Sequence, residues 1–147
     1  LKVVYLDKLE SSNSIQLLSA VGQTMPLHST SLGKAMLAAL PANELDAVLA
    51  EMTLTPRTER TICDLNELRE EIRRTRRRGY AIDDEEQFEG LRCIAVPVFG
   101  PTGLVMASMC VVGPRHRMTH QKLQAVRAPL VAKARRLSAL VGHAPAR

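Results

Sequence analysis

Hydrophobic positions along the chain follow two periodicities, which predict strands and helices in a definite order. Apolar and β-branched runs bounded by turn residues predict strands, whereas apolar residues three or four positions apart predict helices. Strands are expected at 3–6, 15–21, 80–83, 91–99 and 104–112, and helices at about 34–40, 43–52, 65–78 and 120–141. Short connections and a hairpin in this order favour an α/β (α+β) fold, in which helices pack on a largely antiparallel sheet.

The ends of the helices carry recognisable capping residues. Segment 25–40 is expected to form a turn that leads into the first helix, with Ser29, Thr30 or Ser31 as the N-cap. In the third helix, Asp64 is the expected N-cap and Gly79 the expected C-terminal residue. In the last helix, Pro129 is expected to cause a bend or a break.

The third helix has acidic residues in its first half and basic residues in its second half. This order suits the helix dipole, and Glu70 and Arg74 are spaced as an i,i+4 ion pair. The arginine-rich stretch 73–78 has two interpretations, a nucleic-acid or phosphate surface and a solvated helix face. We favour the solvated face, because the dipole and the ion pair already explain the charges.

The hairpin around residues 100–103 brings two cysteines near each other. If Phe99 faces Leu104, Cys93 stands directly opposite Cys110. Alternation places Leu91, Cys93 and Ala95 on one face, and likewise Ser108, Cys110 and Val112. Four interpretations of the two thiols stay open. They line the bottom of a pocket, form a disulfide, provide half of a metal site, or are small buried hydrophobic side chains. For a metal, His28 and Asp83 are the local candidates for further ligands.

Two further features carry possible chemistry. Residues 29–33 begin a helix, whose first amides lack internal partners and attract a carboxylate or a phosphate, although plain N-capping explains them too. Asp83 and Asp84 end a strand beside several glutamates, and such paired carboxylates are candidates for acid–base work or Ca²⁺ binding, although the run lacks EF-hand spacing. Asp83 alone is a candidate for orienting a ligand hydroxyl. A solvated turn is the better interpretation of Asp84 and Glu85.

Composition narrows the classes of protein. The 147 residues suit one domain, and no apolar run approaches the roughly 18 residues that cross a bilayer. The net charge of +5 would suit nucleic acid, but 3% aromatic residues argue against base stacking. Three widely spaced cysteines indicate a reduced, cytoplasmic protein. The chain begins at Leu1 inside a strand-like pattern, so we expect it to be part of something longer.

Four segments together resemble the IclR family of bacterial transcription regulators, namely 26–35, 78–86, 90–98 and 112–114. The resemblance covers essentially the whole chain and implies the C-terminal effector-binding domain of that family. This domain has a GAF-like, profilin-like α/β fold with a curved antiparallel sheet. Residues 1–141 would form it and 142–147 a flexible tail, and the family's N-terminal winged helix-turn-helix would be absent from this chain.

The resemblance also implies a site for a small organic or aromatic acid. Its positions fall on Leu17, Ser31, Leu32, Asp83, Cys93, Cys110 and Val112. The amides of Ser31 and Leu32 would hold the ligand carboxylate, and Leu17 would add an apolar wall. Some members that bind very small keto acids have serines in place of Cys110 and Val112. The less polar floor here favours a larger or more apolar acid.

The leading hypothesis is therefore a small-molecule sensor without catalysis, cofactor, metal or membrane association. The resemblance implies homodimers or tetramers, and operator DNA bound through the missing N-terminal domain. Two other hypotheses stay open. One is a stand-alone GAF-like enzyme that uses Cys93 as its nucleophile, which requires a lowered thiol pKa. The other is direct nucleic-acid binding through 73–78, which predicts strong salt dependence.

Overall fold

A computed structural model describes residues 1–10 and 20–144 of the chain. Its elements in chain order are β1 (Lys2–Val4), β2 (Thr24–Pro26), α1 (Ser31–Ala39), α2 (Ala42–Ala50), α3 (Leu65–Arg78), β3 (Ala81–Asp84), β4 (Leu91–Phe99), β5 (Val105–Pro114) and α4 (His120–Leu140). The expected α/β class is confirmed, and the described elements follow the expected order, although other residues form the second strand.

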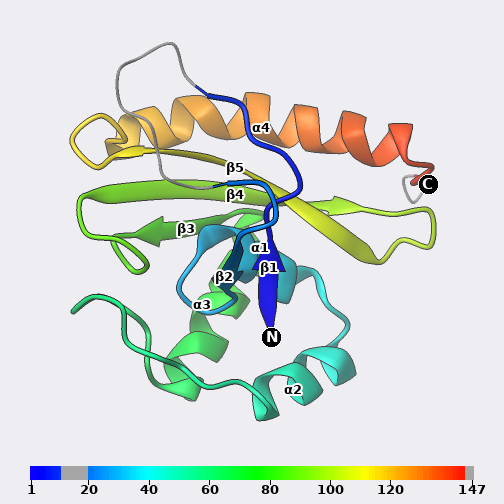
Figure 1. Ribbon diagram of the computed structural model, residues 1–147. Coiled ribbons are helices and arrows are strands. Elements are labelled where there is room, and N and C mark those ends of the chain that lie inside the picture. Colours follow the sequence, from blue (N-terminus) through cyan, green and yellow to red (C-terminus); the bar gives the residue numbers. More distant parts are fainter. Residues whose placement is uncertain (11–19, 145–147) are drawn as a thin grey trace.

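The antiparallel sheet β3-β4-β5 separates two helical layers (Figure 1). Even-numbered residues of β4, such as Ile94 and Val96, face α4 and pack against Leu123 and Leu130. On the opposite face, Ala35 of α1 packs against small residues of β3 and β4. Small side chains on this second face allow α1 to approach the sheet closely.

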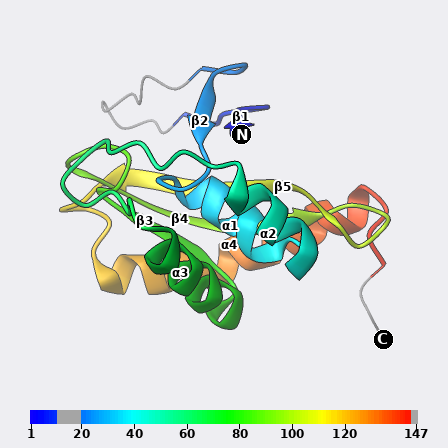
Figure 2. The same ribbon diagram turned by 90° about the horizontal axis from the view of Figure 1, so that it is seen from below.

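A second hydrophobic core lies on the side of α1 that faces away from the sheet. Figure 2, seen from below, shows α1, α2 and α3 in front of the sheet, with the separate β1–β2 hairpin beside them. The buried apolar residues of this core come from both hairpin strands, all three helices and their connections: Val3, Met25, Leu27, Leu37, Ala38, Leu45, Leu49, Ile62, Leu68 and Ile72. The helix α1 is thus packed between the sheet and the α2–α3 layer.

The strand predictions near the N-terminus need correction. The first strand is Lys2–Val4, not 3–6, and its partner is Thr24–Pro26, which we expected to be part of a turn. Residues 15–19 of the expected second strand lie outside the described residues, and Ala20 and Val21 are not in a strand. Three residues that end in proline are too short for a periodic signal, so β2 is set by its pairing with β1.

The predicted hairpin register is wrong by two residues. Phe99 pairs with Val105, and a bulge before it shifts the rest of the ladder, so Cys93 faces Val112 and Ala95 faces Cys110. A five-residue turn accounts for one residue of the shift and the extra residue Met106 for the other. Because an even shift preserves the alternation, the predicted faces are correct.

The helix termini agree well with their sequence signals. Asp64 accepts hydrogen bonds from the amides of Asn66 and Glu67, and Gly79 ends α3 with a left-handed φ of 79°. The helix α4 begins after its N-cap Thr119 and continues through Pro129 without a break. The first helix has Thr30 as its N-cap.

The arginine-rich end of α3 is used largely for internal contacts. Arg76 donates to the carbonyls of Ala38 and Leu40 at the C-terminal end of α1. The expected Glu70–Arg74 pair is wrong: Glu70 pairs with Arg73, and Arg74 pairs with Glu71, in both cases three residues apart. Because of these contacts, fewer of the arginine side chains in 73–78 are available to bind nucleic acid.

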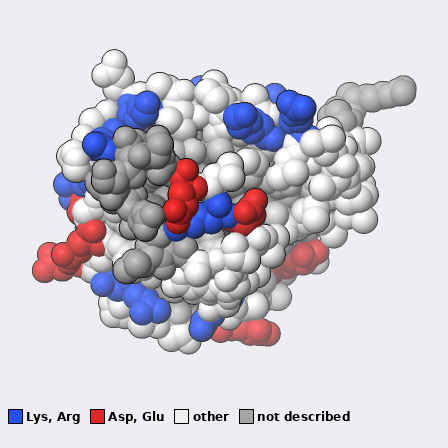
Figure 3. All heavy atoms as spheres, turned by 45° about the horizontal axis from the view of Figure 1, so that its top comes forward, with Lys and Arg blue, Asp and Glu red and all other residues white. Residues whose placement is uncertain are grey.

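The charged side chains lie in separate groups where α4 comes forward, although α4 itself carries five basic residues and no acidic one. Figure 3 shows basic and acidic side chains interspersed with uncharged surface over the described part of this face. A continuous basic stripe is the usual footprint of duplex binding. Among the described residues, no helix is both long and apolar enough to span a bilayer.

Gly33 provides a test of the close packing at the start of α1. A Cβ at this buried position would lie under 3.0 Å from backbone atoms of Leu27, which cannot turn aside as a side-chain end can. We expect Gly33→Ala to lower the free energy of unfolding by about 3 kcal/mol, as measured by urea denaturation.

Gly100→Ala is the matched control. A Cβ there would meet the flexible side chain of Met106 at 3.4 Å, and we expect a cost below about 1 kcal/mol. Equal losses in the two variants would show that α1 does not depend on close contact with Leu27.

Candidate functional site

The N-terminus of α1 carries two amides that are free to bind a ligand. The Thr30 hydroxyl accepts a hydrogen bond from the amide of Gly33 (3.1 Å) and donates one to the Pro26 carbonyl (2.7 Å). The amides of Ser31 and Leu32 have no acceptor among the described residues. With the positive end of the helix dipole, these amides favour a negatively charged group.

Side chains from the facing strands converge on this helix terminus. Cys93 on β4 stands opposite Asp83, its partner on β3, and the side chains of Asp83 and Ser31 both affect the pKa of its thiol. Val112 on β5 stands directly opposite Cys93. The site residues expected on α1 and the sheet are thus brought together, whereas Leu17 lies outside the described residues.

The third strand anchors the helix terminus to the same face. Ser108 donates from its hydroxyl to the carbonyl of Leu32 (3.1 Å). Leu32 and Cys110 both pack against the small cluster formed by α1 and the sheet. Cys110 is therefore diagonal to Cys93, not opposite it, and both thiols are free.

Asp83 is the buried acid of the site. One of its carboxylate oxygens accepts hydrogen bonds from the amides of Glu86 (2.8 Å) and Gln87 (3.4 Å). Burial nevertheless raises the pKa of Asp83 to about 6, because these hydrogen bonds and Lys34 offset only part of the desolvation. The carboxyl group can thus accept or release a proton near neutral pH.

The two thiols are protonated and poorly nucleophilic. Burial, followed by the charge of Asp83, raises the pKa of Cys93 well above its ordinary value and that of Cys110 to about 11. A nucleophilic cysteine needs the opposite change. His28 bonds through Nε2 to the Thr55 carbonyl and not to a cysteine, so the described contacts form no catalytic triad.

Metal coordination finds no support in this arrangement. Over residues 1–10 and 20–144, no three His, Cys, Asp or Glu side chains are grouped as metal ligands. Two hollows lined by described residues lie elsewhere, one beside His28 and one beside Arg60. We therefore assign the candidate site from converging side chains and free amides.

Sequence reasoning missed the ionic cluster beneath the site. Lys34, which is fully buried in α1, is hydrogen-bonded to Glu86 and lies 4.0 Å from Glu71 of α3. Burial raises the pKa of Glu86 to about 7, despite the attraction of Lys34, and its second carboxylate oxygen has no hydrogen-bond partner among the described residues. The sequence does contain one indication of this cluster, because Lys34 stands among apolar residues at the start of a helix.

Two other residues near the site, Gln87 and Tyr5, were also missed, and Ser29 was expected as an N-cap candidate without its contact to Gln87. The Ser29 hydroxyl donates to the side-chain carbonyl of Gln87 (2.5 Å), which ties the segment before α1 to the β3–β4 turn. Tyr5 follows β1, and burial together with Cys110, Cys93 and Asp83 raises the pKa of its phenol to about 12. The phenol of Tyr5 is therefore protonated at neutral pH.

Comparisons with known proteins agree on one family. The family described as bacterial transcriptional regulator IclR C-terminal matches residues 1–139. The HTH-type transcriptional regulator KdgR of Escherichia coli is 38% identical over 141 residues, which cover 96% of this chain and 54% of KdgR. The crystal structure of Thermotoga maritima IclR matches with a TM-score of 0.93 at 35% identity, covering 97% of this chain and 57% of that one.

A third match was solved with a ligand. It is a double mutant of the PobR inducer-binding domain from Acinetobacter in complex with 3-hydroxybenzoic acid, with a TM-score of 0.79 at 29% identity. The match covers 88% of this chain and 75% of that one. The chain spans about half the length of the curated relatives it matches, which are transcriptional regulators and not enzymes. The chain belongs to the IclR C-terminal family of bacterial transcriptional regulators.

Proposed function

We propose that this domain senses a small carboxylic acid, which it binds at the N-terminus of α1. The observation that carries the proposal is the position of the free Ser31 and Leu32 amides beside the buried group Asp83–Cys93. The amides would bind the ligand carboxylate, as negative charge is favoured at a helix N-terminus.

The floor of the site favours an acid with an apolar body. Val112 and the protonated thiols of Cys93 and Cys110 offer little hydrogen bonding to a very small polar ligand. Asp83 would orient a hydroxyl group of the ligand, and Leu17 would add an apolar wall. The 3-hydroxybenzoic acid in the PobR complex has this chemistry, a carboxylate and a hydroxyl on an apolar ring.

The regulatory role rests on a difference in affinity between two arrangements of the whole protein. A ligand shifts an equilibrium only by the difference in its affinity for the two states. We propose that the effector thereby changes how homodimers or tetramers of the full-length, cytoplasmic regulator hold their operator DNA. The DNA contacts would come from an N-terminal winged helix-turn-helix domain.

A thermal-shift screen of the domain tests the proposed ligand class. At a ligand concentration of about 100 times Kd, binding adds about 2.7 kcal/mol to the stability of the folded state. For a domain of this size, that corresponds to a rise in Tm of roughly 5–10 °C. We expect 3-hydroxybenzoate and related aromatic acids to raise Tm more than glyoxylate or pyruvate at equal concentration.

Ser31→Pro and Ser31→Ala form a matched pair for the carboxylate contact. Proline is tolerated at the first position of a helix and removes the amide proton, whereas alanine removes only the hydroxyl. We expect proline to weaken the best acid about tenfold or more beyond the effect of alanine. Equal affinities of the two variants would exclude the Ser31 amide as a carboxylate ligand.

Asp83→Asn tests the buried acid through pH. The folded-state pKa of about 6 lies above the ordinary 3.8, so the stabilising contribution of Asp83 is present at low pH and is lost as the pH rises through about 6. Asparagine does not titrate. Between about pH 5 and pH 8, the variant should gain on the order of 1 kcal/mol relative to the wild type in urea denaturation. A pH-independent difference would contradict the assignment.

A further inference from the structure

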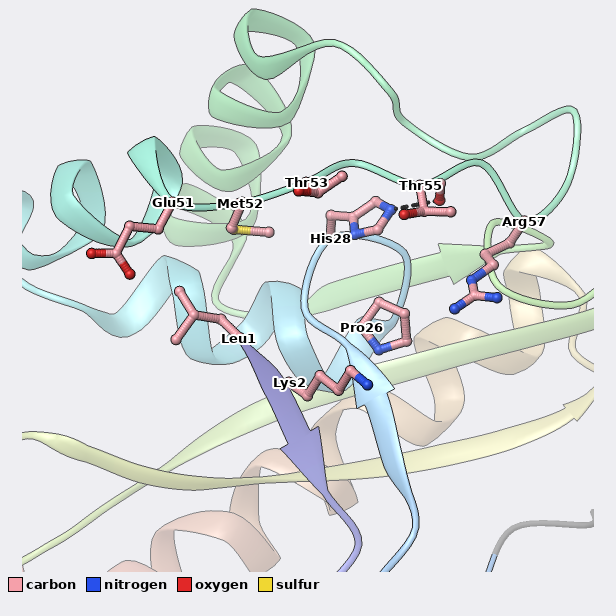
Figure 4. A pocket seen from close by; sticks show the side chains of 9 residues that line it. All are labelled: Leu1, Lys2, Pro26, His28, Glu51, Met52, Thr53, Thr55 and Arg57. Carbon is pink, nitrogen blue, oxygen red and sulfur yellow. Dashed lines mark hydrogen bonds between the residues drawn. The ribbon is translucent and has the colours of Figure 1, made fainter.

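A hollow of about 230 Å³ lies beside the β1–β2 hairpin, on the side of segment 26–30 that faces the connection after α2. Figure 4 shows its lining side chains, which come from the start of β1, from Pro26 and His28, and from residues 51–57. Ordinary ligand pockets measure about 300–1,000 Å³, so this hollow suits only a small molecule. It shares no lining residue with the candidate effector site.

Two cations line this hollow without a matching carboxylate. Lys2 and Arg57 have no ion-pair or side-chain hydrogen-bond partner among the described residues. In Figure 4 both side chains extend toward Pro26, whereas the carboxylate of Glu51, the one acid in the lining, lies at the far side. The centre of the hollow is therefore positively charged.

Uncharged donors complete the lining. The hydroxyl groups of Thr53 and Thr55 lie at the hollow, and His28 donates from Nε2 to the Thr55 carbonyl at 3.0 Å. Since a carbonyl oxygen only accepts, this bond places the proton of neutral His28 on Nε2. Burial, together with Arg57 and Lys34, lowers the pKa of His28, and an anion nearby would favour its charged form.

We propose that this hollow binds a small phosphate dianion, held by the Arg57 guanidinium and the Lys2 ammonium, with the two threonine hydroxyls as further donors. A guanidinium presents two parallel N–H groups that match two phosphate oxygens. The source is either free phosphate or the terminal group of a small phosphate monoester. Because the lining contains two cations, Lys2 and Arg57, and a single, distant acid, Glu51, it favours a dianion over a singly charged carboxylate.

The site would share a backbone segment with the candidate effector site. Thr30, the N-cap of α1, donates its hydroxyl to the carbonyl of Pro26, whose ring lines the hollow. His28 lies between them and contributes its ring to the hollow. The proposal does not depend on carboxylate binding at Ser31 and can fail or succeed independently of it.

Amide chemical shifts during titration with sodium phosphate test this site directly. The ionic strength is held constant with sodium chloride, and glycerol 3-phosphate and acetate are titrated in the same way. We expect saturable shifts at Lys2, at residues 53–55 and at Arg57, with acetate binding at least about tenfold more weakly than phosphate. Tighter binding of glycerol 3-phosphate would identify the monoester as the source, and equal or weaker binding the free ion.

Arg57→Gln and Arg60→Gln are the matched variants. Arg60 is exposed on the same connection but pairs with Asp84 (3.5 Å) and Glu85 (3.7 Å), outside the hollow. We expect Arg57→Gln to weaken phosphate about tenfold or more, and Arg60→Gln to leave it unchanged. Shifts that do not saturate, equal losses in both variants, or shifts centred on Ser31 and Leu32 would each overturn the proposal.

Discussion

The buried ammonium group of Lys34 is the constraint that organises this domain. Lys34 is fully buried in α1, and an isolated charge in such a position would cost far more than the fold can supply. Glu86, from the β3–β4 turn, and Glu71, from α3, provide the compensating carboxylates. A single side chain therefore requires the sheet and α3 to meet α1 at one point.

The same requirement builds the candidate site. The turn that brings Glu86 to Lys34 also holds Asp83 through two backbone amides, and its next residue, Gln87, accepts the Ser29 hydroxyl. Asp83 consequently lies beside the start of α1, where backbone amides and Lys34 offset part of the cost of burying its carboxylate. The amides of Ser31 and Leu32 at the same helix terminus are the groups of this region that suit a small anion.

The sequence allows some parts of this arrangement to be predicted and hides others for physical reasons. Helix ends such as Asp64 and Gly79 are encoded locally, and alternation alone assigns Cys93 to the correct face. The β4–β5 register cannot be read from nearby residues alone, because it depends on the bulge at Met106 and thus on the pairing of the two strands. Lys34 and Glu86 are 52 positions apart, so no short pattern joins them.

A double-mutant cycle of Lys34→Met and Glu86→Gln, measured by urea denaturation, tests the central role of the buried pair. Removing Lys34 alone leaves the buried Glu86 carboxylate without its ion-pair partner, and we expect it to cost about 3–5 kcal/mol. Glu86→Gln in the Lys34→Met background should then be far less destabilising than in the wild type, with a coupling energy of about 2 kcal/mol or more. Effects that add to within about 0.5 kcal/mol would contradict the account.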